Sequence, residues 1–462
     1  MTLSVYNTMT RRKEPFETLE PGVVQMYVCG VTPYADAHVG HGLSAIVFDV
    51  IRRYLEWKGY SVNHAQNFTD IDDKIIARSA QEGIEPLDLV NGLIDRFKEE
   101  IGALNNLPAT YYPRATEEVA HMIEMIEGLI KRGYAYEAEG GDVNYAVTHF
   151  DEYGKLSHRK IEDLLAGSRV EVDERKNHPM DFVLWKAAKP GEPSWDSPWG
   201  PGRPGWHIEC SVMARRYLGN RIDIHGGGAD LIFPHHENEI AQSEAFSDAR
   251  PFARYWMHNA LLQLGGEKMS KSVGNLVTIR ELLDAGNAMA FRLYVLQTHY
   301  RHPLTYSEEG VQSAKRGLER LQSALRNRAE LSGEPSATVA SAIAAAKEQF
   351  QTAMDDDFNS PVAVSVLFDL ARLANQSEDT DRAAAQHAML ELAGILGLRL
   401  DVAEEDGQSG GAGPFIDLLV ELRTALRAGR QWELADKVRD RLTAMGVAVE
   451  DSSDGSTWRW QR

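Results

Sequence analysis

Apolar positions in the first hundred residues alternate between short β-branched runs and longer stretches with helical spacing. The run 22–30 is apolar, rich in valine and closed by glycine, which predicts a buried strand. Leucine, isoleucine and valine then recur at helical spacing over 43–55, which predicts a helix that stops at Gly59. A second strand is expected at 61–68, and helices at 72–82 and 86–104. Strands joined by long helical crossovers predict an α/β fold with a doubly wound parallel sheet.

The pattern changes after about residue 114. A helix predicted at 115–132 leads into short strand-like pieces, and these end in a Pro- and Trp-rich stretch at 189–204. The α/β pattern then resumes with a helix at 208–218, a strand at 221–225, a glycine turn at 226–228 and a helix that opens at Pro234. The segment 114–204 is therefore predicted to be an insertion that divides the sheet.

The remainder of the chain reads as helical. Amphipathic Ala- and Leu-rich stretches run from 307 to about 398, and an acidic, glycine-rich segment at 404–413 predicts a flexible linker. Two helices and a hairpin over 447–460 are expected to follow. The predicted domains are the two halves of a Rossmann-like domain at 1–113 and 205–306, the inserted subdomain at 114–204, an α-helical bundle at 307–400, a linker at 401–413 and a small α+β module at 414–462.

Composition narrows the class of protein. A chain of 462 residues that is 43% hydrophobic suggests roughly two to four domains. No apolar run is long enough to span a membrane, and no secretory signal precedes the first strand. With only two cysteines, a disulfide framework is not expected, which favours a reducing, cytoplasmic location. The net charge of −19 argues against nonspecific nucleic-acid binding, although 414–462 has eight acidic and eight basic residues and leaves a folded RNA partner open.

Two histidines flank Gly40 between the first predicted strand and its helix. The carboxyl ends of parallel strands form the ligand edge of such a sheet, so His38 and His41 are expected there. The helix N-terminus offers free N–H groups to phosphate, and Gly40 allows a base or ribose to approach the backbone. The imidazoles could then stabilise phosphate oxygens in a transition state. By itself, however, this motif is more often a pair of half-buried structural histidines.

A second motif, Lys268-Met269-Ser270-Lys271-Ser272, has glycines on both sides and predicts a mobile loop. Two lysines separated by two residues can converge on a triphosphate, where they supply compact positive charge. The alternative is a solvated surface turn. The pentapeptide at this place after a dinucleotide-type fold favours ATP binding.

The two cysteines, Cys29 and Cys210, both fall at the predicted ligand edge. On the helix after residue 234, His235 and Glu239 share one face, whereas His236 lies about 100° further round. Two thiolates, an imidazole and a carboxylate suit zinc. The alternative is that each free cysteine is a small core hydrophobe. The shared edge favours a zinc site.

Together these residues resemble class I aminoacyl-tRNA synthetases and, within them, the cysteinyl-tRNA synthetases. The resemblance covers nearly the whole chain, with Val39 in place of the usual isoleucine and Leu43 where relatives generally carry arginine or another residue. It is carried by the segments 26–30, 38–41, 69–74, 180–186, 205–210, 223–228, 233–239, 268–272 and 455–459.

The resemblance implies a monomeric enzyme that activates L-cysteine with ATP and Mg²⁺, releases pyrophosphate and passes cysteine to the 3′ end of tRNA(Cys). It implies that the insertion handles the acceptor end and that the C-terminal module binds the anticodon. It further implies one Zn²⁺ on Cys29, Cys210, His235 and Glu239; catalysis by His38, His41, Lys268 and Lys271; ATP binding by those four with Gly40 and Gly227; and amino-acid binding by Cys29, Thr69, Trp206 and Asp230.

Zinc would explain selectivity in such an enzyme. An ordinary pocket separates near-isosteres by only about 10²-fold, roughly 2.7 kcal/mol. Serine differs from cysteine by one atom, but its hydroxyl cannot match a zinc–thiolate bond at neutral pH. Two other functions stay open: a cysteine-adenylating ligase with an amino-sugar acceptor, and a non-enzymatic RNA-binding relative. The helical region and the Trp458/Trp460 tail oppose the first, and the intact histidine and lysine pairs oppose the second.

Overall fold

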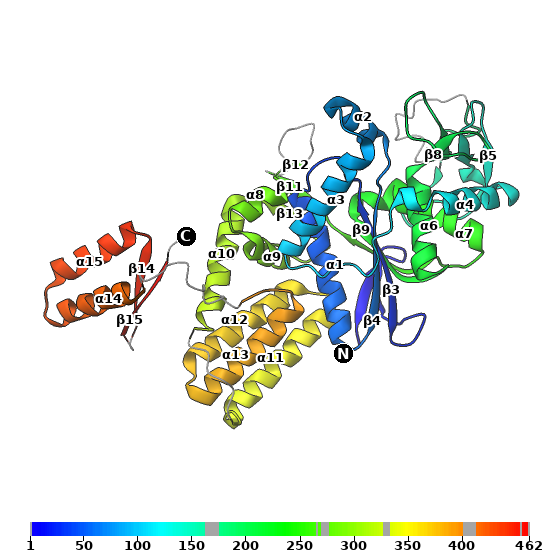
Figure 1. Ribbon diagram of the computed structural model, residues 1–462. Helices are drawn as coiled ribbons and strands as arrows, with labels where there is room; N and C mark the ends of the chain where they lie inside the picture. Colours follow the sequence, from blue (N-terminus) through cyan, green and yellow to red (C-terminus); the bar gives the residue numbers. More distant parts are fainter. Residues whose placement is uncertain are drawn as a thin grey trace. The chain divides into compact units, whose positions relative to one another are not determined.

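The computed structural model describes residues 2–161, 175–264, 267–268, 277–326, 333–400, 413–452 and 455–460. The chain forms two compact units, Met1–Leu400 and Asp401–Arg462 (Figure 1).

A four-stranded parallel sheet lies at the centre of the first unit, in the strand order β10–β9–β3–β4. The strands are β3 (Val23–Val31), β4 (Ser61–Phe68), β9 (Ile222–Gly228) and β10 (Ala253–Asn259). The register of β3 against β4 shifts between Val28 and Val31, so Cys29 lies at an irregularity near the end of its strand. The predicted α/β fold with a parallel sheet is confirmed.

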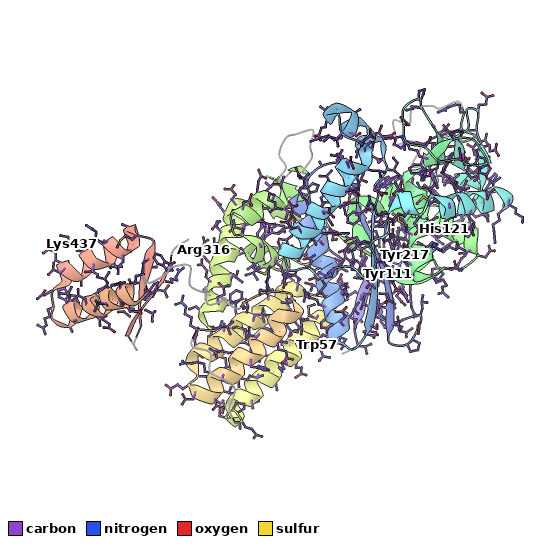
Figure 2. All side chains as sticks on the ribbon, in the orientation of Figure 1. Trp57, Tyr111, His121, Tyr217, Arg316 and Lys437 are labelled. Atoms are coloured by element: carbon purple, nitrogen blue, oxygen red, sulfur yellow. The ribbon has the colours of Figure 1, made fainter. Side chains whose placement is uncertain are left out.

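Helices flank this sheet, and the first and fourth of them pack directly against its strands (Figure 1). They are α1 (Val39–Trp57), α2 (Asp73–Glu82), α3 (Pro86–Ala103), α6 (Trp206–Leu218) and α7 (Glu237–Ser247). Helix α6 ends next to Tyr217, whose ring lies 5.4 Å from that of Tyr111 (Figure 2). The short pieces η3 (Ala229–Leu231) and η4 (Ile232–His236) lie between β9 and α7.

The glycine turn predicted at 226–228 is wrong, because these residues end β9 and pair with 257–259 of β10. A Cβ at Gly226 would lie 2.2 Å from a ring carbon of Phe48, and one at Gly227 would lie 3.1 Å from a ring carbon of His236. The glycines are therefore needed for close packing against α1 and η4. The helix predicted from Pro234 begins instead at Glu237, after a π-helical turn in which Phe233 is extended.

Residues between the two halves of the sheet form a separate antiparallel sheet in the order β5–β6–β7–β8. The strands of this sheet are β5 (Ala135–Glu137), β6 (Val143–Tyr145), β7 (Phe182–Ala187) and β8 (Gly202–Pro204). The helices in the same part of the chain are η1 (Ala115–Glu117), α4 (Val119–Lys131) and η2 (Val147–His149). The single helix predicted at 115–132 is thus divided into η1 and α4. The boundaries of the insertion stay a prediction.

The rest of the first unit is mostly helical. Helices α11, α12 and α13 pack side by side (Figure 1), which confirms the helical prediction after 307 for the described residues. The helices are α8 (Ile279–Asp284), α9 (Ala288–Leu296), α10 (Glu308–Ser323), α11 (Ala337–Asp355), α12 (Ser360–Gln376) and α13 (Asp379–Ile395), and the short strands are β1 (Ser4–Asn7), β2 (Arg12–Pro15), β11 (Leu262–Leu264), β12 (Glu267–Lys268) and β13 (Leu304–Tyr306).

The second unit contains α14 (Gly413–Ala428), α15 (Trp432–Ala444) and the predicted hairpin of β14 (Val447–Ser452) and β15 (Gly455–Trp460). A small core of Ile416, Val420, Leu442 and Val447 joins them. The predicted linker lies outside the described residues except for Gly413, which begins α14. Among the described helices, none is both long and apolar enough to cross a membrane.

Candidate active site

His38 and His41 meet at the start of α1, where their rings stack with centroids 3.7 Å apart. The His38 side chain accepts a hydrogen bond from the Gly40 N–H (3.1 Å), and His41 Nδ1 accepts one from the His38 N–H (3.4 Å). A Cβ at Gly40 would lie 2.9 Å from His38 Nδ1, so this cap requires glycine. The histidines therefore explain why α1 begins at Val39, four residues before the helix that spacing predicts.

The segment that follows the lysine motif adjoins the histidine motif. The Val39 N–H donates to the Val277 carbonyl (3.0 Å), and the Ile279 N–H donates to the Ala37 carbonyl (2.9 Å). The backbone of Lys268 belongs to β12, whereas its side chain and all of Lys271 lie outside the described residues. Their predicted contacts with ATP are not tested by this structure.

The four predicted metal ligands converge at the carboxyl edge of the sheet. Ligand atoms of Cys29, Cys210, His235 and Glu239 all lie within 4.8 Å of one another. The two sulfurs are 3.8 Å apart, Cys29 Sγ is 3.5 Å from Glu239 Oε1, and His235 Nε2 is 3.2 Å from the same oxygen. A tetrahedral zinc ion with ordinary bond lengths has S–S, S–O and N–O edges of about 3.8, 3.6 and 3.4 Å. The donor set and its spacing therefore fit zinc.

A second donor combination overlaps the first, because Cys29 and Glu239 also lie within reach of His225 and His236. His236 Nε2 is 3.3 Å from Cys29 Sγ, so the expectation that His236 faces elsewhere is wrong. The helical spacing fails because residues 232–236 form a π-helical turn and not an α-helix. The first set includes both sulfurs and is the better zinc site.

Neighbouring histidines hold the ligands in position. His225 Nε2 lies 2.8 Å from Glu239 Oε2, the carboxylate oxygen that is not directed at Cys29, and His207 Nδ1 lies 2.9 Å from His235 Nδ1. Such outer hydrogen bonds fix the orientation of metal ligands. Neither histidine is predicted as a site residue from the sequence, although His225 ends the predicted strand 221–225 at the ligand edge.

Burial sets the protonation of this cluster. It raises the pKa of the Cys29 and Cys210 thiols, lowers the pKa of His207 to about 3, and lowers that of His235 well below its usual range. A neutral imidazole is the form that binds a metal, whereas the thiols must lose their protons, which a nearby dication favours.

The candidate amino-acid-binding residues differ in their surroundings. Thr69 is 3% exposed and donates a hydrogen bond to Glu209 (2.7 Å), while Trp206 is 41% exposed and its ring lies tilted against that of His235 with centroids 4.2 Å apart. Asp230 is exposed, and its carboxylate lies against Gly228. Trp206 thus lies against a predicted metal ligand, Thr69 reaches the residue that precedes Cys210 in sequence, and Asp230 lies just beyond the end of β9.

Comparison with known proteins decides the family. A model of the tRNA synthetases class I (C) catalytic domain matches residues 15–316, and a DALR domain model matches 349–401. A Cysteine–tRNA ligase of Dehalococcoides mccartyi (strain ATCC BAA-2266) is 55% identical over 460 residues, with 99% of each chain covered. The chain belongs to the cysteine–tRNA ligase family. Another member of the family, from Thioalkalivibrio sulfidiphilus, is 50% identical over 464 residues, again with 99% of each chain covered.

Solved structures agree on the class I fold beyond this family. Mycobacterium tuberculosis methionyl-tRNA synthetase bound by methionyl-adenylate has a TM-score of 0.59 at 17% identity, covering 86% of this chain and 94% of that chain. The LeuRS of Agrobacterium radiobacter, in a ternary complex with tRNA and LeuAMS, has a TM-score of 0.62 at 12% identity, covering 83% and 86%. At such identities the likeness concerns the fold alone. In this member of the cysteine–tRNA ligase family, Leu43 is 5% exposed in the apolar core.

Proposed function

We propose that this protein is an ATP-dependent cysteine–tRNA ligase. It converts L-cysteine and ATP to cysteinyl-adenylate and pyrophosphate, and then transfers the cysteinyl group to the 3′ end of tRNA(Cys) with release of AMP. The observation that carries the proposal is the Cys29–Cys210–His235–Glu239 cluster at the carboxyl edge of the sheet, in a chain that matches cysteine–tRNA ligases over 99% of its length. The proposed enzyme is a cytoplasmic monomer.

The protein's own residues prepare the thiol site. Cys29, Cys210, His235 and Glu239 would hold one zinc ion, with His225 fixing the Glu239 carboxylate. The chemistry that zinc supplies when bound is a bond to the substrate thiolate that the hydroxyl of serine cannot match. The partly exposed ring of Trp206 packs against the ring of His235 and would limit the access of water to the proposed metal site.

ATP, with Mg²⁺, is proposed to bind at the start of α1. The positive end of the helix dipole attracts phosphate there, while the Val39 and Gly40 N–H groups are already donated to the Val277 carbonyl and to His38. His38 and His41 lie at that end and Gly227 lies at the neighbouring end of β9. Lys268 and Lys271 are proposed to neutralise charge on the triphosphate as pyrophosphate leaves.

The tRNA is proposed to contact two parts of the chain, its acceptor end at the insertion 114–204 and its anticodon at 414–462. The full-length similarity to cysteine–tRNA ligases favours tRNA over an amino-sugar acceptor. Trp460 is 37% exposed on the hairpin of the second unit and could stack on an unpaired base.

Cysteine-dependent ATP–pyrophosphate exchange tests the activation step. We expect exchange with cysteine, at most about 1% of that rate with serine, and loss of exchange in a zinc chelator that added zinc reverses. Charging of tRNA(Cys) tests the transfer step against an amino-sugar acceptor. Exchange that does not depend on cysteine, or consumption of the adenylate by the amino sugar alone, would contradict the proposal.

A further inference from the structure

A chain of hydrogen bonds connects the two segments that carry the cysteines. The Gly30 N–H donates to Asn67 Oδ1 (2.9 Å), Asn67 Nδ2 donates to Thr69 Oγ1 (3.4 Å), and the Thr69 hydroxyl donates to Glu209 Oε2 (2.7 Å). Gly30 follows the first cysteine in sequence, and Glu209 precedes the second. The chain therefore crosses the candidate amino-acid site from the end of β3, past the end of β4, to the start of α6.

The backbone N–H of Gly30 fixes which atom donates and which accepts at the first hydrogen bond of this chain. A backbone N–H can only donate, so Gly30 requires the Asn67 amide to present its oxygen, and the amide nitrogen then faces Thr69. A hydroxyl has one proton and two lone pairs. The Thr69 hydroxyl donates its proton to Glu209, and one of its lone pairs accepts from Asn67. Among the described residues, these two partners leave the second lone pair of Thr69 able to accept another hydrogen bond.

Packing leaves this chain little freedom. Asn67, Thr69 and Glu209 are 2%, 3% and 1% exposed. A Cβ at Gly30 would lie 1.7 Å from the Asn67 carbonyl oxygen, which shows how closely β3 and β4 approach there. Each of these buried hydrogen bonds keeps its donor and its acceptor, because reversing one would leave a buried polar group without a partner at the full cost of its desolvation.

We propose that Glu209 is a positioning residue for the amino-acid substrate, and that it aims the acceptor lone pair of Thr69 at the substrate α-ammonium. This inference rests on the proposed function. The ammonium of cysteine is only a few bonds from its sulfur, so a thiol at the Cys29–Cys210 cluster brings it to residues that flank these cysteines. Thr69 lies close to these residues, because its backbone N–H donates to the Val31 carbonyl (3.1 Å) at the end of β3 and its hydroxyl donates to Glu209.

The chemical need for Glu209 follows from the ammonium, which has only donors. A Thr69 hydroxyl that rotated freely could point its proton at the ammonium and repel it. Glu209 removes this orientation by accepting the proton. Zinc would thus select the thiol, while Thr69, held by Glu209, would select a free amino group.

Two matched variants test the inference in the zinc-loaded full-length protein. Glu209→Gln keeps an oxygen that accepts the Thr69 proton, whereas Glu209→Met has similar length without that acceptor. In pyrophosphate exchange we expect Glu209→Met to raise the KM for cysteine roughly 10- to 100-fold and Glu209→Gln to raise it less than about threefold. The KM for ATP should change little in both variants. 3-Mercaptopropionate has the thiol and carboxylate without the ammonium, so its inhibition constant should differ by less than about twofold among the three proteins.

Several results would overturn the inference. Equal weakening of cysteine and 3-mercaptopropionate, or a loss of zinc from Glu209→Met, would show that Glu209 supports the metal ligands. Equal losses in the Gln and Met variants would show that its charge is what matters. If Glu209→Met does not fold, Thr69→Val against Thr69→Ser tests the hydroxyl that Glu209 is proposed to aim; only Thr69→Val should raise the KM for cysteine, and an unchanged KM there would overturn the inference. Failure of the wild-type protein to exchange pyrophosphate with cysteine would instead contradict the proposed function.

Discussion

At the scale of single residues, the two oxygens of the Glu239 carboxylate face three different partners. Its Oε1 faces Cys29 and His235, and its Oε2 lies 2.8 Å from His225 Nε2. Glu239 and His225 are both fully buried, so solvent does not compete for the second oxygen. The orientation of Glu239, on α7, toward the thiols therefore depends on His225, a residue of strand β9.

Replacing His225 should weaken zinc binding without unfolding the protein. We expect His225→Ala to lower zinc affinity roughly 10- to 100-fold, because an outer partner of a metal ligand is lost. Competition with a chromogenic chelator measures this affinity. His387→Ala, at an exposed histidine of α13, is the matched control and should bind zinc like the wild-type protein. Equal zinc affinity in the two variants would contradict a role for His225.

His64 on β4 should make the first unit sensitive to acid. Burial lowers its pKa from 6.5 to about 3, and neither ring nitrogen has a partner among the described residues. Above pH 6.5 both folded and unfolded chains are neutral at this site and the free energy of unfolding is unaffected. Below it the unfolded state takes up the proton first, so the folded state loses about 2 kcal/mol of stability by pH 5.

The variant His64→Leu tests this loss of stability in acid, because leucine cannot take up a proton. Between pH 7 and 5, His64→Leu should lose less stability than the wild-type protein by about 2 kcal/mol, as measured by denaturant unfolding of the first unit. The other buried histidines titrate equally in both proteins and cancel in the difference. His387→Leu is the exposed control. Parallel pH profiles of wild type and His64→Leu would rule the effect out.

At the scale of elements, glycine and proline signals predict some boundaries, whereas contacts between elements are predicted poorly. Strand β4 and helix α3 lie where predicted, because Gly59 and Pro86 punctuate the apolar pattern. The glycines at 226–228 give the same local signal as a turn, but Gly226 faces the Phe48 ring and Gly227 faces the His236 ring, contacts with other elements that no local pattern contains. In the same way, residue type and strand order indicate the four candidate zinc ligands, while the roles of their partners on other elements become visible only in the fold.

The close contact of β9 with α1 can be tested at Gly226. We expect Gly226→Ala to destabilise the first unit by about 1–3 kcal/mol, because the added Cβ would lie 2.2 Å from the Phe48 ring. Gly92→Ala is the matched control, since a Cβ there meets nothing within 4 Å in helix α3. Alanine should stabilise that exposed helical position by about 0.5–1 kcal/mol. Thermal unfolding of the three proteins gives the comparison, and a neutral Gly226→Ala would show that β9 and α1 adjust freely.

At the scale of the whole molecule, the two compact units have separate cores. The metal cluster and the histidine motif both belong to Met1–Leu400, and the second unit has its own small core around Ile416 and Leu442. Its hairpin is tied to α14 by Arg423, which donates to both oxygens of Asp451 (2.7 and 2.9 Å). Amino-acid activation and anticodon binding are therefore expected to be separable.

Removal of the second unit should distinguish these two steps. We expect a chain that ends at Leu400 to retain cysteine-dependent pyrophosphate exchange within about threefold, because all candidate ligands and both motifs lie upstream. Charging of tRNA(Cys) at limiting tRNA should fall roughly 10²-fold or more, since the acceptor end would bind without a second, linked contact. Asp451→Ala in the full-length chain provides a milder change, because it removes the partner of Arg423, and should impair charging while leaving exchange intact. Equal losses of exchange and charging in the shortened chain would show that the second unit supports the fold of the first, and would remove the basis for assigning it to the anticodon.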